Sequence, residues 1–549
     1  MMTAEAYDIL EDHAAAADTR HLLMNKKNLN LAAKLSYVDS GRYAALVSSL
    51  RGWEHLPDFK KQVARLKATG EAAYKRDKAV EAGRPILSVE KPVETASAFI
   101  RERHPHLKFT DNAWLDYNGR FYHVVEERAV KASLQEFMAS GVDEETGADL
   151  HPKQRPVEEA LDAVKNQTFR SIDAAEPPVW EPIDYIDPDP RMCIATTNGI
   201  LDLESGTLLP HSPRLFTRTA VNYAFEPTAP EPTGFLAFLE SIWPEAEGGA
   251  ENKAALQEMV GYLLTGMTKF QKVFLLVGAP NAGKGVLAKV IEALVGVDNV
   301  VSQSVSKLGS PFGMKALLGK TVMVVPDLRF GKNDNIGGIT EAILNISGED
   351  RTNISRKYLD DKQARLSVRL VLMSNMEVTL PDQSGALRRR LFPLVFTKNF
   401  EGREDVTLHD KLMAELPGIL NWALAGLRRL EERRDATTGR QVGFVLTTEG
   451  RKMVNNIARR GSPVHSFLRE ACTLRADGQT PKARLFDAFE QWYREGAGVE
   501  AHHTEEMFAR ELHVASGYAI DSCKPRIDGR QVPHFKGVVL KPEWMNFGY

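Results

Sequence analysis

Four short apolar runs recur through the middle of the chain. They are Val273–Val277, Val322–Val325, VRLVLMSN at 368–375 and LFPLVF at 391–396. A helical pattern follows the first run, with apolar residues at Val286, Leu287, Val290, Ile291 and Leu294. Apolar residues three and four positions apart form one face of a helix, whereas short unbroken apolar runs are typical of buried strands. We therefore predict an α/β domain with these runs as its strands.

The pattern divides the rest of the chain into further regions. Residues 1–87 are Ala-rich and helical, whereas 92–230 mix helices with short strands, including a predicted hairpin at Trp114–Val125 about Asn118-Gly119. The linker GRPILSVEKPVE separates these two regions, and the proline-rich run EPTAPEPTG precedes the α/β region. We predict four domains: a helical region at 1–87, an α+β domain at 92–230, the α/β domain at 235–435, and a domain at 463–549.

The last region, 463–549, has the outline of a winged helix. Three helical segments, VHSFLREACTL, KARLFDAFEQWYREG and TEEMFARELHVAS, precede two strands about Asp528-Gly529. Such a module often places its third helix in the major groove of DNA. Because its charge is near balance, binding to a partner protein is the alternative interpretation.

Composition limits the classes of protein and site. A length of 549 residues fits several domains, and 43% hydrophobic with 26% charged residues is ordinary for a globular protein. The formal net charge of −3 means that any nucleic-acid surface must be local. Cys193, Cys472 and Cys523 lie far apart without a CxxC pair, which argues against a disulfide scaffold or zinc site.

The N-terminal sequence and the length of apolar runs indicate where in the cell the protein is found. The N-terminus lacks the basic start and apolar core of a signal peptide, and no apolar run reaches about 18 residues. We expect a protein of the cytoplasm that does not span a membrane.

The loop after the first strand has the composition of a phosphate-binding loop. Its sequence is Gly278-Ala279-Pro280-Asn281-Ala282-Gly283-Lys284, followed by Gly285 and Val286. Glycines let backbone N–H groups turn toward an anion, and the helix N-terminus adds the positive end of its dipole. Lys284 is expected to reach the β- and γ-phosphates of ATP. A glycine-rich turn that packs without a ligand is the alternative.

Two positions depart from the usual ATP site. The residue after the lysine is commonly Ser or Thr, whose hydroxyl binds Mg²⁺, and here it is Gly285, so a water would take that position. Asp327 follows the second strand and is the expected Mg²⁺ ligand, through water, but Pro326 stands where many ATPases have a second acid. Glu341 or Glu349 are open candidates for polarising the attacking water. Nucleotide binding is therefore a stronger expectation than fast hydrolysis.

Polar and basic residues follow the third strand. Asn375 ends it, at the position of a sensor for the γ-phosphate, and Arg388-Arg389-Arg390 precede the fourth strand. A guanidinium from Arg389 or Arg390 would stabilise charge on a phosphoryl group held by a neighbouring subunit. A solvated basic turn is the alternative.

The segment 351–370 carries six basic and two acidic residues. It is predicted to form a hairpin with Asp360-Asp361-Lys362-Gln363 at its tip. Contacts with the phosphate backbone are electrostatic and independent of sequence, so we expect Arg356, Lys357 and Lys362 to bind DNA. An ordinary solvated hairpin is the alternative.

The order of these motifs resembles that of the superfamily 3 helicases, in the poxvirus, phage and plasmid primase–helicase branch. The resemblance covers roughly residues 92–549 and is carried by NGILDLESGTLLPHSP, GAPNAGKG, VVPDL, ISGEDRTNISRKY, LMSNMEVTLPDQSGALRRRLFPLVF and the tail from VHSFL to GVVLKP. It implies an AAA+-like ATPase using ATP and Mg²⁺, a hexamer that encircles single-stranded DNA and unwinds it with 3′ to 5′ polarity. It also implies a helicase-associated α+β domain before the motor and a winged-helix domain after it.

Carried over by position, the resemblance assigns roles to individual residues. Lys284 is implied as the Walker A lysine, Asp327 as the Walker B acid and Asn375 as sensor 1. Arg389 or Arg390 would be the trans-acting finger, and Lys357 or Lys362 the base of the DNA-binding hairpin. Residues 1–87 lack an Asp-x-Asp strand motif, so we expect no primer synthesis.

Three functions are compatible with these patterns. The first is an ATP-dependent DNA helicase in phage, prophage or plasmid replication, working with other replication proteins. The second is a weakly hydrolysing, nucleotide-gated ring ATPase that acts as a replication initiator, loader or scaffold. The third, a nucleotide kinase, would need a lid and an acceptor pocket that the sequence does not reveal.

Overall fold

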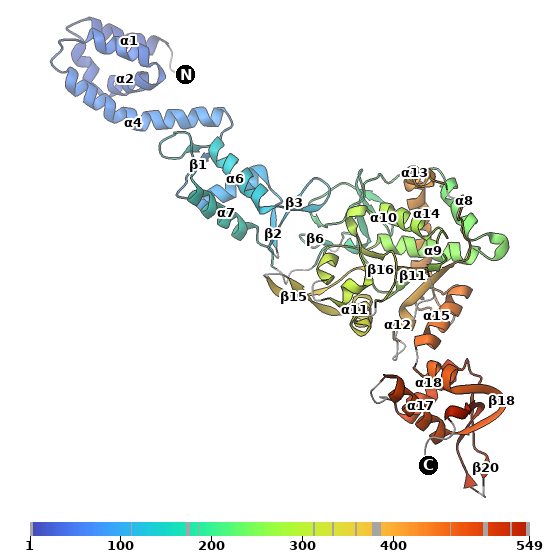
Figure 1. Ribbon diagram of the computed structural model, residues 1–549. Helices are drawn as coiled ribbons and strands as arrows, with labels where there is room; N and C mark the ends of the chain where they lie inside the picture. The colour runs from blue at the N-terminus through green and yellow to red at the C-terminus, as the bar shows by residue number, and fades with distance from the viewer. Residues whose placement is uncertain are drawn as a thin grey trace. The chain divides into compact units, whose positions relative to one another are not determined.

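The computed structural model describes residues 4–110, 112–171, 176–184, 186–310, 313–331, 334–356, 359–375, 386–403, 405–461, 463–497, 503–527 and 530–544. The chain divides into two compact units. The first contains residues 1–118 and 122–175, and the second contains 119–121 and 176–549. Figure 1 shows the helices and strands of both units.

The first unit begins with a bundle of helices. These are α1 (Ala4–Ala15), α2 (Lys26–Val38), α3 (Ser40–Ser49) and α4 (Leu56–Glu81). Their apolar faces meet in a core that includes Leu10, Leu35 and Phe59, each fully shielded from solvent. The helical pattern predicted for this part of the chain is therefore present.

The rest of the first unit is mixed α and β. Its elements are β1 (Ile86–Leu87), α5 (Pro92–Arg103), β2 (Lys108–Thr110), β3 (Ala113–Tyr117), β4 (Tyr122–Val125), α6 (Glu127–Ser140), β5 (Val142–Asp143) and α7 (Gln154–Thr168). The predicted hairpin about Asn118-Gly119 is confirmed, since β3 and β4 pair antiparallel and Gly119 has φ of 94°. The predicted linker is wrong at residues 86–87. They form β1, which pairs with β5, because Leu87 is buried in the core beneath α5 and α6.

The second unit is built on a five-stranded parallel sheet in the order β12-β13-β16-β11-β17. The strands are β11 (Val273–Gly278), β12 (Val300–Ser302), β13 (Val322–Val325), β16 (Arg369–Ser374) and β17 (Leu391–Phe396). The helices are α8 (Thr233–Ile242), α9 (Ala250–Leu264), α10 (Lys284–Val295), α11 (Ile336–Gly348), α12 (Ala386–Arg390), α13 (Leu408–Ala414), α14 (Leu416–Glu432) and α15 (Thr448–Gly461). The four strands predicted from apolar runs are all present.

Both faces of this sheet are covered, which explains why its strands are mainly apolar. Phe274 and Leu276 of β11 pack on the side of α9, α10 and α14. Val273 and Leu275 point to the opposite face and pack with α11 and α15. Because side chains alternate along a strand, every position of β11 needs an apolar residue.

The strands that precede α8 share the core of this unit. They are β6 (Val179–Trp180), β7 (Cys193–Ala195), β8 (Ile200–Asp202), β9 (Leu208–Leu209) and β10 (Leu215–Phe216). Ile194 and Leu201 pack in the same apolar cluster as α9 and α14. For this reason the part of the 92–230 region that follows residue 175 lies in the second unit with the parallel sheet.

A basic hairpin forms between α11 and β16, with β14 (Arg351–Arg356) antiparallel to β15 (Leu359–Arg365). The predicted tip is wrong, because Asp360-Asp361-Lys362-Gln363 lie within β15. The first strand of the hairpin, β14, ends at residue 356, and the second, β15, begins at residue 359. The register is set by burial instead, since Thr352, Ile354 and Ala364 are shielded from solvent and Thr352 faces Ala364.

The C-terminal subdomain has its own core, formed by α16 (Pro463–Ala471), α17 (Lys482–Ala497) and α18 (Glu505–Ala515) against a sheet. The sheet contains β18 (Cys472–Pro481), β19 (Asp521–Cys523) and β22 (His534–Leu540), in the antiparallel order β18-β22-β19. A second ribbon pairs β20 (Arg526–Ile527) with β21 (Arg530–Gln531). The three predicted helices are present, but β18 was missed because its polar centre, RADGQ at 475–479, masks the strand pattern.

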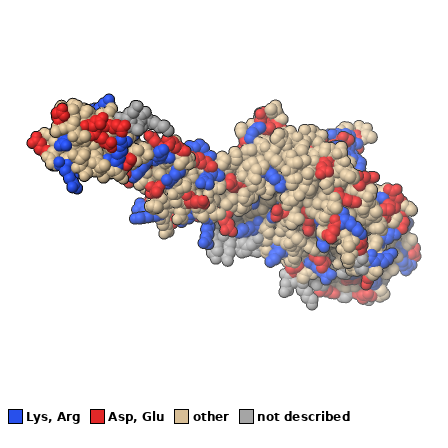
Figure 2. Space-filling view, turned by 90° about the horizontal axis from the view of Figure 1, so that it is seen from above, with Lys and Arg blue, Asp and Glu red and all other residues tan. Residues whose placement is uncertain are grey.

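No helix among the described residues is long and apolar enough to cross a membrane. Figure 2 shows one face of the molecule, on which basic and acidic side chains are mixed. This mixture agrees with the formal net charge of −3, so a surface for nucleic acid must be sought in particular elements.

Candidate nucleotide site

The candidate site lies where three parallel strands end side by side. β16 pairs with β11 on one side and with β13 on the other. Because these strands are parallel, their carboxyl ends meet at one edge of the sheet, which is where ligands bind in such folds. That edge carries the loop after β11, Pro326 and Asp327 after β13, and Asn375 after β16.

Two glycines of the loop are required by its geometry. A Cβ on Gly278 would come within 2.4 Å of the carbonyl oxygen of Phe396, so only glycine allows β17 to lie this close. Gly283 precedes α10 with φ of 90°, a left-handed conformation that side chains rarely adopt. The sequence therefore shapes the backbone of this loop before any ligand binds.

Lys284 is the first residue of α10, and its side chain folds back over the loop. Its ammonium donates hydrogen bonds of 2.7 Å to the carbonyl oxygens of Gly278 and Ala279. The residue is 5% exposed, and this burial lowers the pKa of its ammonium. Among the residues that the structure describes, no carboxylate pairs with Lys284, and a buried cation of this kind is well placed to gain from an incoming anion.

The loop forms one wall of a cavity of about 600 Å³. The cavity is lined by the predicted Pro280, Asn281, Ala282, Gly283, Lys284, Gly285, Val286 and Asn375, together with Phe238, Ser241, Pro326, Met373, Phe400, Arg403, Asp405 and Leu408. Gly278 and Ala279 contribute the carbonyl groups that hold Lys284. One wall is thus backbone-rich and cationic, and Phe238, Phe400 and Leu408 supply apolar surface.

The segment between β17 and α13 was missed by sequence analysis. Its Phe400 amide donates a 2.9 Å hydrogen bond to the carbonyl oxygen of Asn281, which docks this segment on the loop. Arg403 and Asp405 also line the cavity. Hydrogen bonds from Lys411 and Thr407 lower the pKa of Asp405 to about 2, so this carboxyl stays charged. The only sequence signal was the mixture of aromatic and charged residues in NFEGRED.

Asp327 lies at the same edge of the sheet, but its carboxylate forms a 2.7 Å ion pair with Arg329. The lining residue from this strand end is Pro326. Glu341 and Glu349 are the candidates for polarising water. Glu349 accepts a hydrogen bond from Thr268, and Glu341 is exposed on α11. Neither residue lines the cavity. Asp327, Glu341 and Glu349 therefore lie outside the lining of this cavity.

Arg389 and Arg390 are neighbours on α12 with different surroundings. The guanidinium of Arg390 donates to the carbonyl oxygen of Leu344 and to the Ser347 hydroxyl, near the C-terminus of α11. Arg389 is exposed, and its guanidinium has no partner among the residues that the structure describes. The Arg390 side chain is thus tied to one carbonyl oxygen and one hydroxyl of α11, which leaves Arg389 as the better candidate for a finger.

The residues predicted to bind DNA lie on the β14–β15 hairpin. Arg356 is the last residue of β14, and Lys362 pairs with Ile354 across the ribbon. Lys357 lies outside the described residues. Within the described ranges no group of three or more His, Cys, Asp or Glu residues could hold a metal ion.

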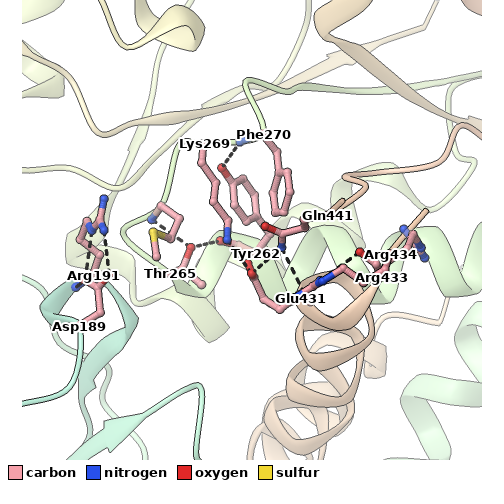
Figure 3. Close-up of polar contacts among 11 residues, drawn as sticks. Asp189, Arg191, Tyr262, Thr265, Lys269, Phe270, Glu431, Arg433, Arg434 and Gln441 are labelled. Atoms are coloured by element: carbon pink, nitrogen blue, oxygen red, sulfur yellow. Dashed lines mark hydrogen bonds and ion pairs between the residues drawn. The ribbon is translucent and has the colours of Figure 1, made fainter. Parts of the chain in front are cut away.

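A second cavity, of about 360 Å³, is lined by residues near α14, including Asp189, Lys269, Glu431, Arg434 and Gln441 (Figure 3). Here Glu431 accepts hydrogen bonds from Lys269 at 2.6 Å and from Gln441 at 2.9 Å. Asp189 is likewise paired with Arg191. These charges already compensate one another, so the cavity offers less to a charged ligand than the one beside Lys284.

Two segments of the chain match known families. Residues 99–244 match a family described as "D5 N terminal like". Residues 276–390, which contain the loop, β13 and β16, match a family of unknown function (DUF5906).

The chain is also similar to solved structures. The apo structure of the NrS-1 C terminal region (305-718) is 12% identical, with a TM-score of 0.43, and the match covers 82% of this chain and 99% of that one. The A form apo structure of the NrS-1 C terminal region-CTR is 10% identical, with a TM-score of 0.40, covering 78% of this chain and 96% of that one.

Proposed function

We propose that this protein is an ATP-dependent DNA helicase of phage, prophage or plasmid replication. The observation that carries the proposal is the cavity beside Lys284, because it joins a cationic, backbone-rich loop to apolar side chains. The loop and the N-terminus of α10 suit the phosphates of ATP. Phe238, Phe400 and Leu408 suit the base.

The DNA part of the proposal has separate support. The "D5 N terminal like" match at 99–244 supports an association with phage replication. In this proposal the protein acts in the cytoplasm of a bacterial host. The β14–β15 hairpin supplies basic residues for the phosphate backbone of single-stranded DNA. In this proposal the protein forms a ring, a hexamer, that moves with 3′ to 5′ polarity, and Arg389 reaches the nucleotide of the neighbouring subunit.

Unwinding of forked DNA tests the proposal directly. The protein with ATP and Mg²⁺ should displace the strand when the tail has a free 3′ end and fail on the matched fork with only a 5′ tail. Lys284→Ala should abolish unwinding, whereas Lys289→Ala, an exposed lysine on the same helix, should not. Equal displacement from both forks would refute the polarity, and full activity of Lys284→Ala would refute the motor site.

A specific observation favours a second function, a weakly hydrolysing ring ATPase that serves as an initiator, loader or scaffold. Asp327 is held by Arg329, and Gly285 provides no hydroxyl for Mg²⁺. If this function is correct, ATP binds tightly without turnover, and DNA loading depends on ATP binding alone. Arg329→Ala would then raise turnover by freeing Asp327 for the metal.

A further inference from the structure

The β20–β21 hairpin of the C-terminal subdomain differs in charge from the rest of the subdomain. Lys524, Arg526, Arg530 and Lys536 are exposed along the hairpin and its base. Among the residues that the structure describes, none of the four forms an ion pair with a carboxylate. The acidic residues of the segment are Asp521, across from Lys536 in the sheet, and Asp528, which lies outside the described residues. The segment 521–536 therefore carries four basic residues against two acidic ones.

The third helix of the subdomain has the opposite balance. α18 carries Glu505, Glu506 and Glu511 against Arg510 as its one Lys or Arg residue. Glu505 and Glu506 are exposed at its N-terminus, the end that a recognition helix presents to DNA. Phosphates would be repelled there, so charge favours the hairpin as the DNA-contacting element.

The pairing of the ribbon places its two arginines on opposite faces. Arg526 is paired with Gln531, and Ile527 is paired with Arg530. Directly paired residues share a face of a ribbon, whereas consecutive residues point to opposite faces. Arg526 and Ile527 are consecutive, so Arg526 and Arg530 point in opposite directions. In Figure 1 the ribbon projects beyond the three-stranded sheet of the subdomain.

We propose that the β20–β21 hairpin binds duplex DNA by entering a groove. The major groove of B-DNA admits a two-stranded β-ribbon. A phosphate backbone borders each side of the groove, so one arginine on each face meets one backbone. A single strand offers only one backbone and cannot engage both faces at once. This inference deepens the DNA side of the proposed function and rests on it.

Binding of the full-length protein to a duplex and to a single strand of equal length tests the inference. Fluorescence anisotropy over a series of salt concentrations gives the slope of log affinity against log salt, which is about −0.9 for each phosphate contact on duplex DNA. Arg526→Ala and Arg530→Ala should each reduce the duplex slope by about 0.9, and the double variant by about 1.8. Their affinity for the single strand should not change.

Arg475→Ala is the matched control. Arg475 is also an exposed arginine of this subdomain, on β18, but Asp477 holds it in a 2.8 Å ion pair. It should leave both slopes unchanged, as should Arg510→Ala on α18. The inference is overturned if the double variant keeps the duplex slope, if single-strand affinity falls equally, or if Arg475→Ala has the same effect.

ATP binding without DNA separates this inference from the proposed function. The hairpin variants should bind ATP as the wild type does, because the cavity beside Lys284 contains none of these residues. If the hairpin variants lose duplex affinity but the wild-type protein does not unwind DNA, the hairpin inference is supported and the motor is refuted. If the double variant still unwinds DNA and keeps the wild-type salt slope for duplex binding, the motor is supported and the hairpin inference is refuted.

Discussion

At the scale of single residues, the proposed function makes Gly285 a determinant of how well Mg²⁺ is held. A Cβ built on Gly285 meets nothing within 4 Å, so a larger side chain fits there without rearrangement. Gly285→Ser adds the hydroxyl that usually binds the metal at this position. We expect the apparent Mg²⁺ affinity in ATP hydrolysis to rise on the order of tenfold, the scale of one contact near a metal.

Gly285→Ala is the control for this change. It removes the same backbone freedom from α10 but adds no oxygen, so it should leave the Mg²⁺ dependence unchanged. If alanine and serine have equal effects, the metal is not held from residue 285.

The pKa of Lys284 predicts how ATP affinity depends on pH. Burial lowers the pKa of the free lysine, whereas bound phosphates favour its charged form and raise that pKa. ATP affinity should therefore be constant below the lowered pKa and fall as the pH rises through it. Calorimetric titration across neutral to alkaline pH measures this fall.

Lys284→Arg provides the comparison, because arginine stays charged over this range. Its ATP affinity should be weaker but nearly independent of pH. An equal fall in both proteins would assign the pH dependence to another group.

At the scale of elements, α12 separates the two arginine roles. Arg390→Ala removes charge-assisted hydrogen bonds near the C-terminus of α11 and should lower the free energy of unfolding by about 1.5–3 kcal/mol, measured with urea. Arg389→Ala should change stability by less than about 0.5 kcal/mol, because the side chain is exposed.

Arg389→Ala, which should change stability little, should have the specific effect on ATP hydrolysis. Arg389→Ala subunits mixed with wild type should inhibit hydrolysis by more than their share, because each spoils the site of a neighbour. Inhibition in simple proportion to mutant content would contradict a role in trans.

Basic residues of the β14–β15 hairpin should contribute to the affinity for single-stranded DNA. Lys357→Ala and Lys362→Ala should weaken its binding and reduce the slope of log affinity against log salt by about 0.7 per residue. Lys289→Ala, on a helix with no predicted DNA contact, should leave the slope unchanged. Unchanged slopes for both hairpin variants would move the DNA site elsewhere.

The elements that sequence could predict are those whose pattern follows from burial. β11, β13, β16 and β17 are mainly apolar because helices cover both faces of their sheet, with Arg369 and Ser374 as polar residues at the two ends of β16. The hairpin tip was misplaced because the polar run at 360–363 looks like a turn, whereas buried Ile354 and Ala364 set the register. β18 was missed for a related reason, since its centre is polar.

The candidate site was predictable in part. The loop at 278–286 has a local sequence signature, because glycine is required wherever the backbone is strained or crowded. Phe400 and Arg403 have no such signature. They reach the cavity through a hydrogen bond between the segment before α13 and the loop, a tertiary contact that no periodicity encodes.

At the scale of the whole molecule, we assign ATP and DNA to different elements of the second unit. The cavity lies at one edge of the parallel sheet, and the proposed DNA contacts lie on the β14–β15 and β20–β21 hairpins. A motor must couple these sites, so DNA binding should change the rate of hydrolysis. A ring gated by nucleotide alone needs no such coupling.

The most direct test is therefore the steady-state ATPase rate of the full-length protein with Mg²⁺, measured with and without single-stranded DNA. We predict turnover that rises severalfold with DNA and is absent in Lys284→Ala under both conditions. Tight ATP binding without turnover, whether or not DNA is present, would contradict the helicase.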